Sequence, residues 1–255
     1  ARPPRTMPLA HQLEAQITCH AWNGDRTMLA LSPNNEHIHI YRLEDSDGNP
    51  RFTLTHTLSE HDALVSGLDW APRSDRLVSV SHDRNAYVWH RDGDRWQPTL
   101  VILRIQRAAT SVAWSPDEQK FAVGSGEKLV PVCYYEEQHS WWVSKQIKRH
   151  TSTVLCVAWS PDSLLLATGC ADGKARAISG FVKGVDEAPG AAPAFGAVVG
   201  EFGCGGWVHA VAWHPNGRSF AYASHSSVIG VVTLDSGGGS EQLVRLRTLP
   251  VKALA

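Results

Sequence analysis

Three short stretches of the sequence combine residue types that enzymes use for hydrolysis, for holding a metal or for holding a phosphate. Ser81, His82 and Asp83 are the residue types of a catalytic triad, in which a serine attacks, a histidine takes its proton and an aspartate orients the histidine. The three residues are consecutive, however, and neighbours in a strand point to alternate faces, whereas triad members converge from distant segments. The sequence therefore predicts no triad here.

A second stretch holds two histidines that could begin a zinc site. His37 and His39 are two residues apart on a predicted strand, so their side chains share one face, with Glu36 close by in sequence. Glu36 points to the other face, and no third ligand follows at a spacing typical of zinc sites. We expect no metal at these histidines.

The third stretch, Gly-Ser-Gly-Glu-Lys at 124–128, is similar to a phosphate-binding loop only in its glycines. It lacks the Gly-Lys-Ser/Thr ending and the helix that must follow, so a turn between strands explains it better. Cys204 lies among three glycines and leads into a predicted strand, with a reactive thiol as the alternative reading. The sequence thus predicts a protein that is not an enzyme and has no cofactor.

The composition excludes several other classes of function. The 255 residues carry 24 Lys and Arg against 25 Asp and Glu, a net charge of -1, so nucleic acid or an anionic membrane finds no global attraction. At 43% hydrophobic residues the chain is typical of a globular protein. No apolar run approaches the roughly 20 residues that span a bilayer, and the first ten residues lack the apolar centre of a signal peptide.

The five cysteines agree with a reducing compartment. Their number is odd, they have no Cys-x-x-Cys spacing, and most lie in apolar stretches, as reduced buried thiols do. We therefore expect an intracellular protein.

A repeat runs through most of the chain. Five copies of an apolar-x-Trp-x-Pro pattern, or a close variant, are marked by Trp22, Trp70, Trp114, Trp159 and Trp213. The steps between these tryptophans are 48, 44, 45 and 54 residues. A WD-type propeller blade has roughly 40–45 residues, and the last step is long because a Gly/Ala/Pro-rich loop is inserted at 183–196.

Within each copy the hydrophobic period is two, which indicates short strands joined by tight turns. In blade two the predicted strands are 64–70, 76–81, 86–89 and 99–105. The predicted fold is all-β, a WD40-type β-propeller of five blades over 17–255, in which each marker Trp is wedged between adjacent sheets. Residues 249–255 are predicted to begin a sixth blade, and residues 1–16 to close the last one. An open arc of blades would expose apolar sheet faces, so we expect this chain to be part of a longer protein.

Two blades carry the side chains of the WD-repeat hydrogen-bond network, in which an imidazole joins a turn carboxylate to a hydroxyl that accepts an indole N–H. In blade two these residues are His61, Ser79, Asp83 and Trp89. In blade four they are His150, Thr168 and Asp172, with Ile178 in place of the Trp. Because Ile178 has no donor, we expect the blade-four network to end at Thr168.

The surface offers a candidate partner interface on the outer strands of blades two and three. Its residues are basic or aromatic: Arg104, Arg107, Trp141, Trp142 and Lys145. A basic edge could meet an acidic partner, and the alternative is that these charges only protect an exposed edge strand. Of the adjacent indoles, one is expected to face the neighbouring blade and the other to face outwards, where exposed tryptophans are enriched at binding hot spots.

Longer motifs resemble one family. They are Asp-Arg-Asn-Ala-Tyr-Val-Trp at 83–89, Pro-Thr-Leu-Val-Ile-Leu-Arg-Ile at 98–105, Trp-Trp-Val-Ser-Lys at 141–145 and Gly-Trp-Val-His-Ala-Val at 206–211. From about Ile17 to Leu254 the chain resembles subunit 1 of the actin-related protein 2/3 complex, its 40-kDa WD-repeat subunit.

That resemblance implies a seven-bladed propeller that acts as a non-catalytic scaffold in the cytoplasm, at the actin cytoskeleton. The partners it implies are two actin-related proteins, subunits 4 and 5, the actin filament and an acidic nucleation-promoting factor. No nucleic acid and no membrane insertion are implied. By resemblance, the edge with Arg104 and Arg107 docks either an acidic activator tail or a neighbouring subunit. The alternative function is a WD-repeat adaptor of another multi-subunit complex.

Overall fold

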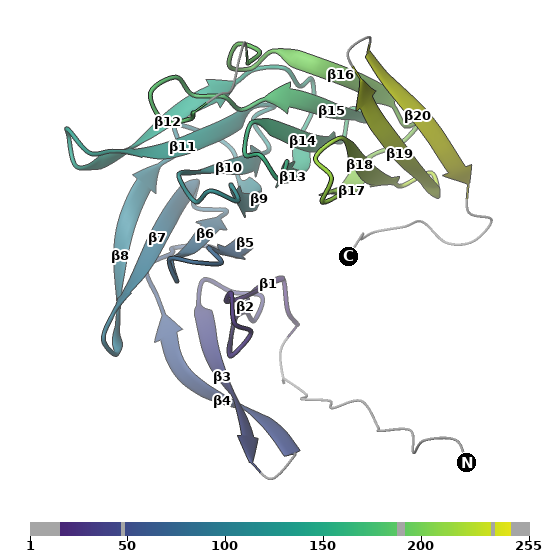
Figure 1. The fold of residues 1–255 in the computed structure, drawn as a ribbon. Coiled ribbons are helices and arrows are strands. Elements are labelled where there is room, and N and C mark those ends of the chain that lie inside the picture. Colours follow the sequence, from purple (N-terminus) through teal and green to yellow (C-terminus); the bar gives the residue numbers. More distant parts are fainter. Residues whose placement is uncertain (1–15, 47–48, 188–191, 236–237, 246–255) are drawn as a thin grey trace, which may run out of the picture.

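The described part of the chain forms five four-stranded antiparallel sheets, which follow one another in sequence and lie around an arc (Figure 1). The computed structural model describes residues 16–46, 49–187, 192–235 and 238–245. In each sheet the strands pair in sequence order, from an innermost first strand to an outer fourth one. The predicted all-β propeller architecture is therefore confirmed.

Within the described ranges no helix is long and apolar enough to cross a membrane.

The strands group into blades as follows. Blade one contains β1 (Cys19–Trp22), β2 (Met28–Ser32), β3 (Ile38–Ser46) and β4 (Asn49–Leu58). Blade two contains β5 (Val65–Trp70), β6 (Leu77–Ser81), β7 (Asn85–Asp92) and β8 (Arg95–Ile102). Blade three contains β9 (Ala109–Trp114), β10 (Lys120–Ser125), β11 (Val130–Glu136) and β12 (Trp141–Ile147). Blade four contains β13 (Val154–Trp159), β14 (Leu165–Cys170), β15 (Lys174–Ser179) and β16 (Val198–Gly203). Blade five contains β17 (Val208–Trp213), β18 (Ser219–Ser224), β19 (Val228–Asp235) and β20 (Gly238–Arg245).

The outer strand of blade two differs from its prediction at both ends. It covers Arg95–Ile102 rather than 99–105, because β7 and β8 form a long hairpin around Gly93, whose φ is +60°. Pro98 is tolerated in β8 since an outer strand needs no ladder bond on its free side. Arg104 has a φ of +56°, which is incompatible with extended strand and places it in the connection to blade three.

The core lies between neighbouring blades, and the marker tryptophans fill it. Trp70, Trp114 and Trp159 are at most 6% exposed, and each packs into a cluster with the preceding blade. The indole N–H of Trp159 donates to the carbonyl of Ala113 at 3.0 Å, one blade back. Trp22 is 38% exposed, because no described sheet covers the side of blade one on which the other tryptophans meet their neighbours.

The inserted loop of blade four is fastened to blade three. Asp186 forms a buried ion pair with Lys120 of β10. Further along, the Phe195 ring lies 4.3 Å from the Lys145 ammonium, and the Arg149 guanidinium donates to the carbonyl of Gly196 at 2.9 Å. The loop is therefore a strap across the seam between the two blades, on either side of positions 188–191, which lie outside the described residues.

Two further predictions concern segments that the structure does not describe. The proposed closing segment 1–16 lies outside the described residues except for its last position, and the proposed start of a sixth blade at 249–255 lies outside them completely.

Candidate interaction surfaces

Blade two contains the complete hydrogen-bond network. The His61 imidazole bonds the Asp83 carboxylate through Nδ1 at 2.7 Å and the Ser79 hydroxyl through Nε2 at 2.8 Å. The Trp89 indole donates to the same hydroxyl at 2.9 Å. Burial alone would raise the pKa of Asp83, but the bonds from His61 and the Asn85 backbone outweigh it and lower the pKa. This carboxylate is thus a structural group that ties the turn to the strand entering the blade.

The same residues in blade four are arranged differently. His150 bonds the Thr168 hydroxyl at 2.9 Å, but the predicted bond from His150 to Asp172 is wrong. Instead, the Arg176 guanidinium forms an ion pair with the Asp172 carboxylate, with an N–O distance of 2.9 Å. Arg176 also pairs with the carboxylate of Glu201. Blade two has Tyr87 at the corresponding position, and its ring packs edge-on against His61. The sequence feature that could have indicated this pairing is Arg176 itself, a charged residue at an inward-facing strand position.

Because His150 is buried with only one of its nitrogens bonded, its protonation should oppose folding. Burial, reinforced by the nearby guanidinium of Arg176, lowers the pKa of His150 to about 4. The unfolded chain binds a proton below the ordinary histidine pKa of about 6.5, while the folded chain does so only near its own lower pKa. The free energy of unfolding should therefore fall by about 2 kcal/mol between pH 7 and pH 5 through this residue alone.

A His150→Leu variant isolates this contribution. Urea unfolding at pH 7 and pH 5 should show a smaller loss of stability in the variant than in the natural sequence. Asp69, whose pKa burial raises to about 6, changes with pH equally in both proteins and cancels from the comparison. An equal loss in both proteins would contradict the assigned role of His150.

A loop-to-turn junction recurs in successive blades. The backbone N–H of Asp62 donates to the Asp83 carboxylate at 3.1 Å, and that of Thr151 donates to Asp172 at 3.3 Å. In blade three the N–H of Gln106 donates to Glu127. Blade three has Ile105 where the histidine would stand and Val123 where the hydroxyl would stand, so Glu127 closes the junction without the rest of the network.

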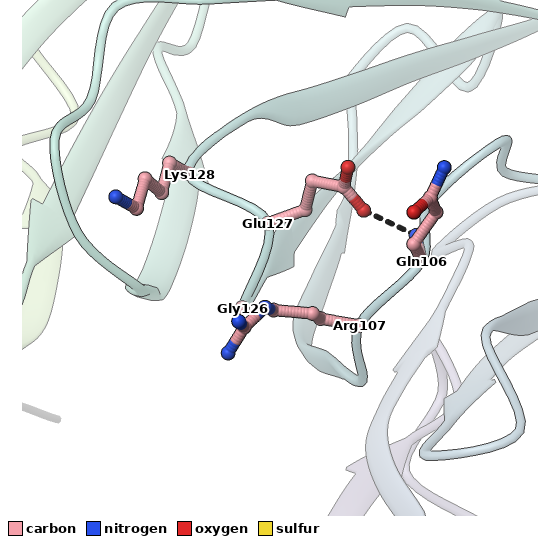
Figure 2. A pocket seen from close by; sticks show the side chains of 5 residues that line it. All are labelled: Gln106, Arg107, Gly126, Glu127 and Lys128. Atoms are coloured by element: carbon pink, nitrogen blue, oxygen red, sulfur yellow. Dashed lines mark hydrogen bonds between the residues drawn. The ribbon is translucent and has the colours of Figure 1, made fainter.

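Beside this junction the surface is hollowed, as Figure 2 shows. The hollow has a volume of about 550 Å³ and is lined by Gln106, Arg107, Gly126, Glu127 and Lys128. Arg107 runs along Gly126, and Lys128 extends from the far side of Glu127 (Figure 2). Arg107, one of the candidate interface residues, therefore belongs to a polar hollow.

A second, apolar groove of about 170 Å³ lies between the outer strands β8 and β12. Its walls include Leu100, Ile102 and Trp141, which are 48%, 63% and 57% exposed. Trp142 lines the groove but packs inwards, with its ring 5.2 Å from that of Phe121. Arg104 supplies the one cationic side chain of the lining.

The five candidate interface residues thus occupy three places. Arg104, Trp141 and Trp142 line the apolar groove, Arg107 lines the polar hollow, and Lys145 is held against Phe195 of the strap. Sequence reasoning missed Leu100 and Ile102, although their alternation on an outer strand was a usable signal.

Two residues of the Ser81-His82-Asp83 stretch have structural roles. The Ser81 hydroxyl donates a hydrogen bond to the carbonyl of Ala63 at 2.8 Å, and the Asp83 carboxylate is hydrogen-bonded to the His61 imidazole. In the part of the chain that the structure describes, no group of three or more His, Cys, Asp or Glu side chains is placed to hold a metal ion.

Comparison with known proteins identifies the family of this chain. The model of the WD domain, G-beta repeat, matches residues 52–90 and 141–178. Actin-related protein 2/3 complex subunit 1A-B of Xenopus laevis is 48% identical over 93% of this chain and 65% of its own length. Subunit 1A of Arabidopsis thaliana is 48% identical over 95% of the chain and 65% of its own length. Subunit 1 of Schizosaccharomyces pombe is 42% identical over 98% of the chain and 68% of its own length.

A solved structure supports the fold alone. A chain in the crystal structure of the mitotic checkpoint complex matches with a TM-score of 0.74 at 21% identity, over 93% of this chain and 69% of that one. The chain spans about two thirds of the length of the curated relatives it matches. With the repeats, the five sheets and these relatives together, the chain belongs to the family of actin-related protein 2/3 complex subunit 1.

Proposed function

We propose that this chain is a non-catalytic scaffold subunit of the actin-related protein 2/3 complex in the cytoplasm, at the actin cytoskeleton. It supports the formation of branched actin filaments by contacting the two actin-related proteins, subunits 4 and 5, an acidic nucleation-promoting factor and the existing filament. Support for the complex comes from the names of the relatives, which are subunits of that assembly. Support for a binding role comes from the apolar groove between β8 and β12.

The groove carries this proposal because exposed apolar side chains are concentrated there. Leu100, Ile102 and Trp141 are each about half exposed or more, and a large indole at the surface is a common anchor of protein interfaces. Arg104 at the same groove favours a partner that brings a carboxylate beside its apolar side chain. An acidic activator tail or a neighbouring subunit would bind here by presenting a carboxylate next to an apolar side chain.

The test is recovery of partners from a cell extract with the tagged full-length protein, followed by mass spectrometry. We expect the two actin-related proteins and the small companion subunits to be recovered. Recovery of a different set without any actin-related protein would favour the alternative, an adaptor of another complex, and would overturn the proposed function.

A Trp141→Ala variant tests the groove itself. Removal of a hot-spot indole typically lowers affinity about tenfold or more, so at least one of these partners should be lost from the recovered set. Trp207→Ala is the matched control, because Trp207 is an indole exposed to the same degree, 56%, at the start of blade five. Equal recovery with both variants would exclude the groove as the docking surface.

A further inference from the structure

Blade three departs from its neighbours at the junction described above, and the departure adds positive charge. Arg107 follows the junction N–H of Gln106, where blade two has Ala63 and blade four has Ser152 at the same repeat position. Lys128 follows Glu127 with a φ of +69°, as Arg84 follows Asp83 in blade two with a φ of +74°, so the charge that blade three adds is that of Arg107. Both cationic side chains border the hollow of about 550 Å³ in Figure 2.

The charges of this hollow are not balanced within the protein. Its one carboxylate, Glu127, accepts the backbone N–H of Gln106. Among the described residues neither Arg107 nor Lys128 has a carboxylate within ion-pair distance. A guanidinium and an ammonium thus line an open hollow in a blade that has Ile105 and Val123 in place of the histidine and hydroxyl of the repeat. Places where a protein breaks its own local pattern are where function is expected.

We propose that this hollow binds the phosphoryl group of a phosphorylated serine or threonine in an extended segment of a partner protein. A phosphomonoester carries a charge of about -1.5 to -2 at neutral pH and three strong acceptor oxygens, which match two cations better than a single carboxylate does. The planar Arg107 fork suits two of those oxygens, and Lys128 supplies a point charge for the third. The site lies apart from the apolar groove and does not depend on membership in the complex.

The test uses the full-length, ¹⁵N-labelled protein and a Gly-Gly-phosphoSer-Gly-Gly peptide, followed by NMR titration of the backbone amides. We expect the amides of 105–108 and 126–129 to shift, and the unphosphorylated peptide to leave them in place. The double variant Arg107→Ala/Lys128→Ala should weaken binding about tenfold or more, since each charge-assisted bond contributes substantially. Arg84→Ala is the matched control, because Arg84 stands at the Lys128 position of blade two and also has a positive φ.

Each of the remaining outcomes overturns part of the assignment. No shift of these amides, or equal weakening by the control, would exclude the site. Inorganic phosphate binding as tightly as the phosphopeptide would exclude a peptide ligand, and a Gly-Gly-Glu-Gly-Gly peptide binding as tightly would exclude selectivity for a phosphoryl group. The spectrum of the unbound double variant shows whether it is folded, so a loss of binding through unfolding is recognised directly.

Discussion

Replacing Lys120 by methionine should lower the free energy of unfolding by about 3 to 5 kcal/mol, the usual cost of removing one partner from a buried ion pair. The Lys120 side chain is fully buried, and the Asp186 side chain with which it pairs is 2% exposed. The ammonium also lies 4.9 Å from the centre of the Trp159 ring. Burial lowers the pKa of Lys120, while the carboxylate of Asp186 opposes that change and holds the charge in place.

The large effect comes from the carboxylate that remains. Without Lys120, Asp186 keeps only the backbone N–H of Val182, at 2.6 Å, as a partner for its charge, and its second oxygen has no hydrogen-bond partner. The strap of residues 183–196 should then lift from blade three. Limited proteolysis within the strap, together with urea unfolding, measures both consequences.

A second substitution distinguishes the cost of the unpaired Asp186 charge from the cost of changing the shape of the Lys120 side chain. In the double variant Lys120→Met/Asp186→Asn no charge is buried, and the amide oxygen still accepts from Val182, so most of the lost stability should return. Lys174→Met is the matched control, since Lys174 and Glu201 form a pair whose side chains are 44% and 40% exposed. Exposed pairs contribute little, so that variant should change stability by less than about 1 kcal/mol. A loss as large as that of Lys120→Met would contradict the argument from burial.

This ion pair also shows what sequence reasoning could and could not predict. The repeated tryptophans predict the blades, because one residue type at one strand position must fill the same inter-blade space each time. The alternation along β12 predicts that one of the two adjacent indoles faces outwards and the other packs against a blade, and Trp141 is 57% exposed whereas Trp142 packs against Phe121. The pairing of Lys120 with Asp186 joins a strand of one blade to an inserted loop of the next, and no periodic pattern relates two such positions.

The candidate site was less predictable for a related reason. Arg104 and Arg107 are three residues apart in a connecting loop, and there the backbone, rather than a strand period, decides where each side chain points. The positive φ of Arg104 turns the chain between them, so one lines the apolar groove and the other lines the polar hollow. In blade four, the competition of Arg176 with His150 for Asp172 depends on distances that spacing does not contain.

Replacing Gly24 by alanine should have the second large effect on stability. A Cβ atom at this position would lie 1.9 Å from the backbone carbonyl oxygen of Pro72 and 2.8 Å from its carbon. The turn of blade one therefore meets the corresponding turn of blade two with no room for a side chain. Because the obstacle is backbone, relief requires the two blades to separate, and we expect a loss of about 3 kcal/mol, the upper part of the range for overpacking.

Because the strain lies between blades one and two, its effect on amide hydrogen exchange should be confined to part of the molecule. Amide hydrogen exchange should accelerate in β1 to β4, whose packing against blade two is broken, while β9 to β16 keep their protection because their own seams are untouched. Gly203→Ala is the control, since a Cβ there meets nothing within 4 Å. Uniform loss of protection in all five blades would show that the arc unfolds as one unit, and an unchanged stability would show that the seam between blades one and two is loose enough to admit a methyl group.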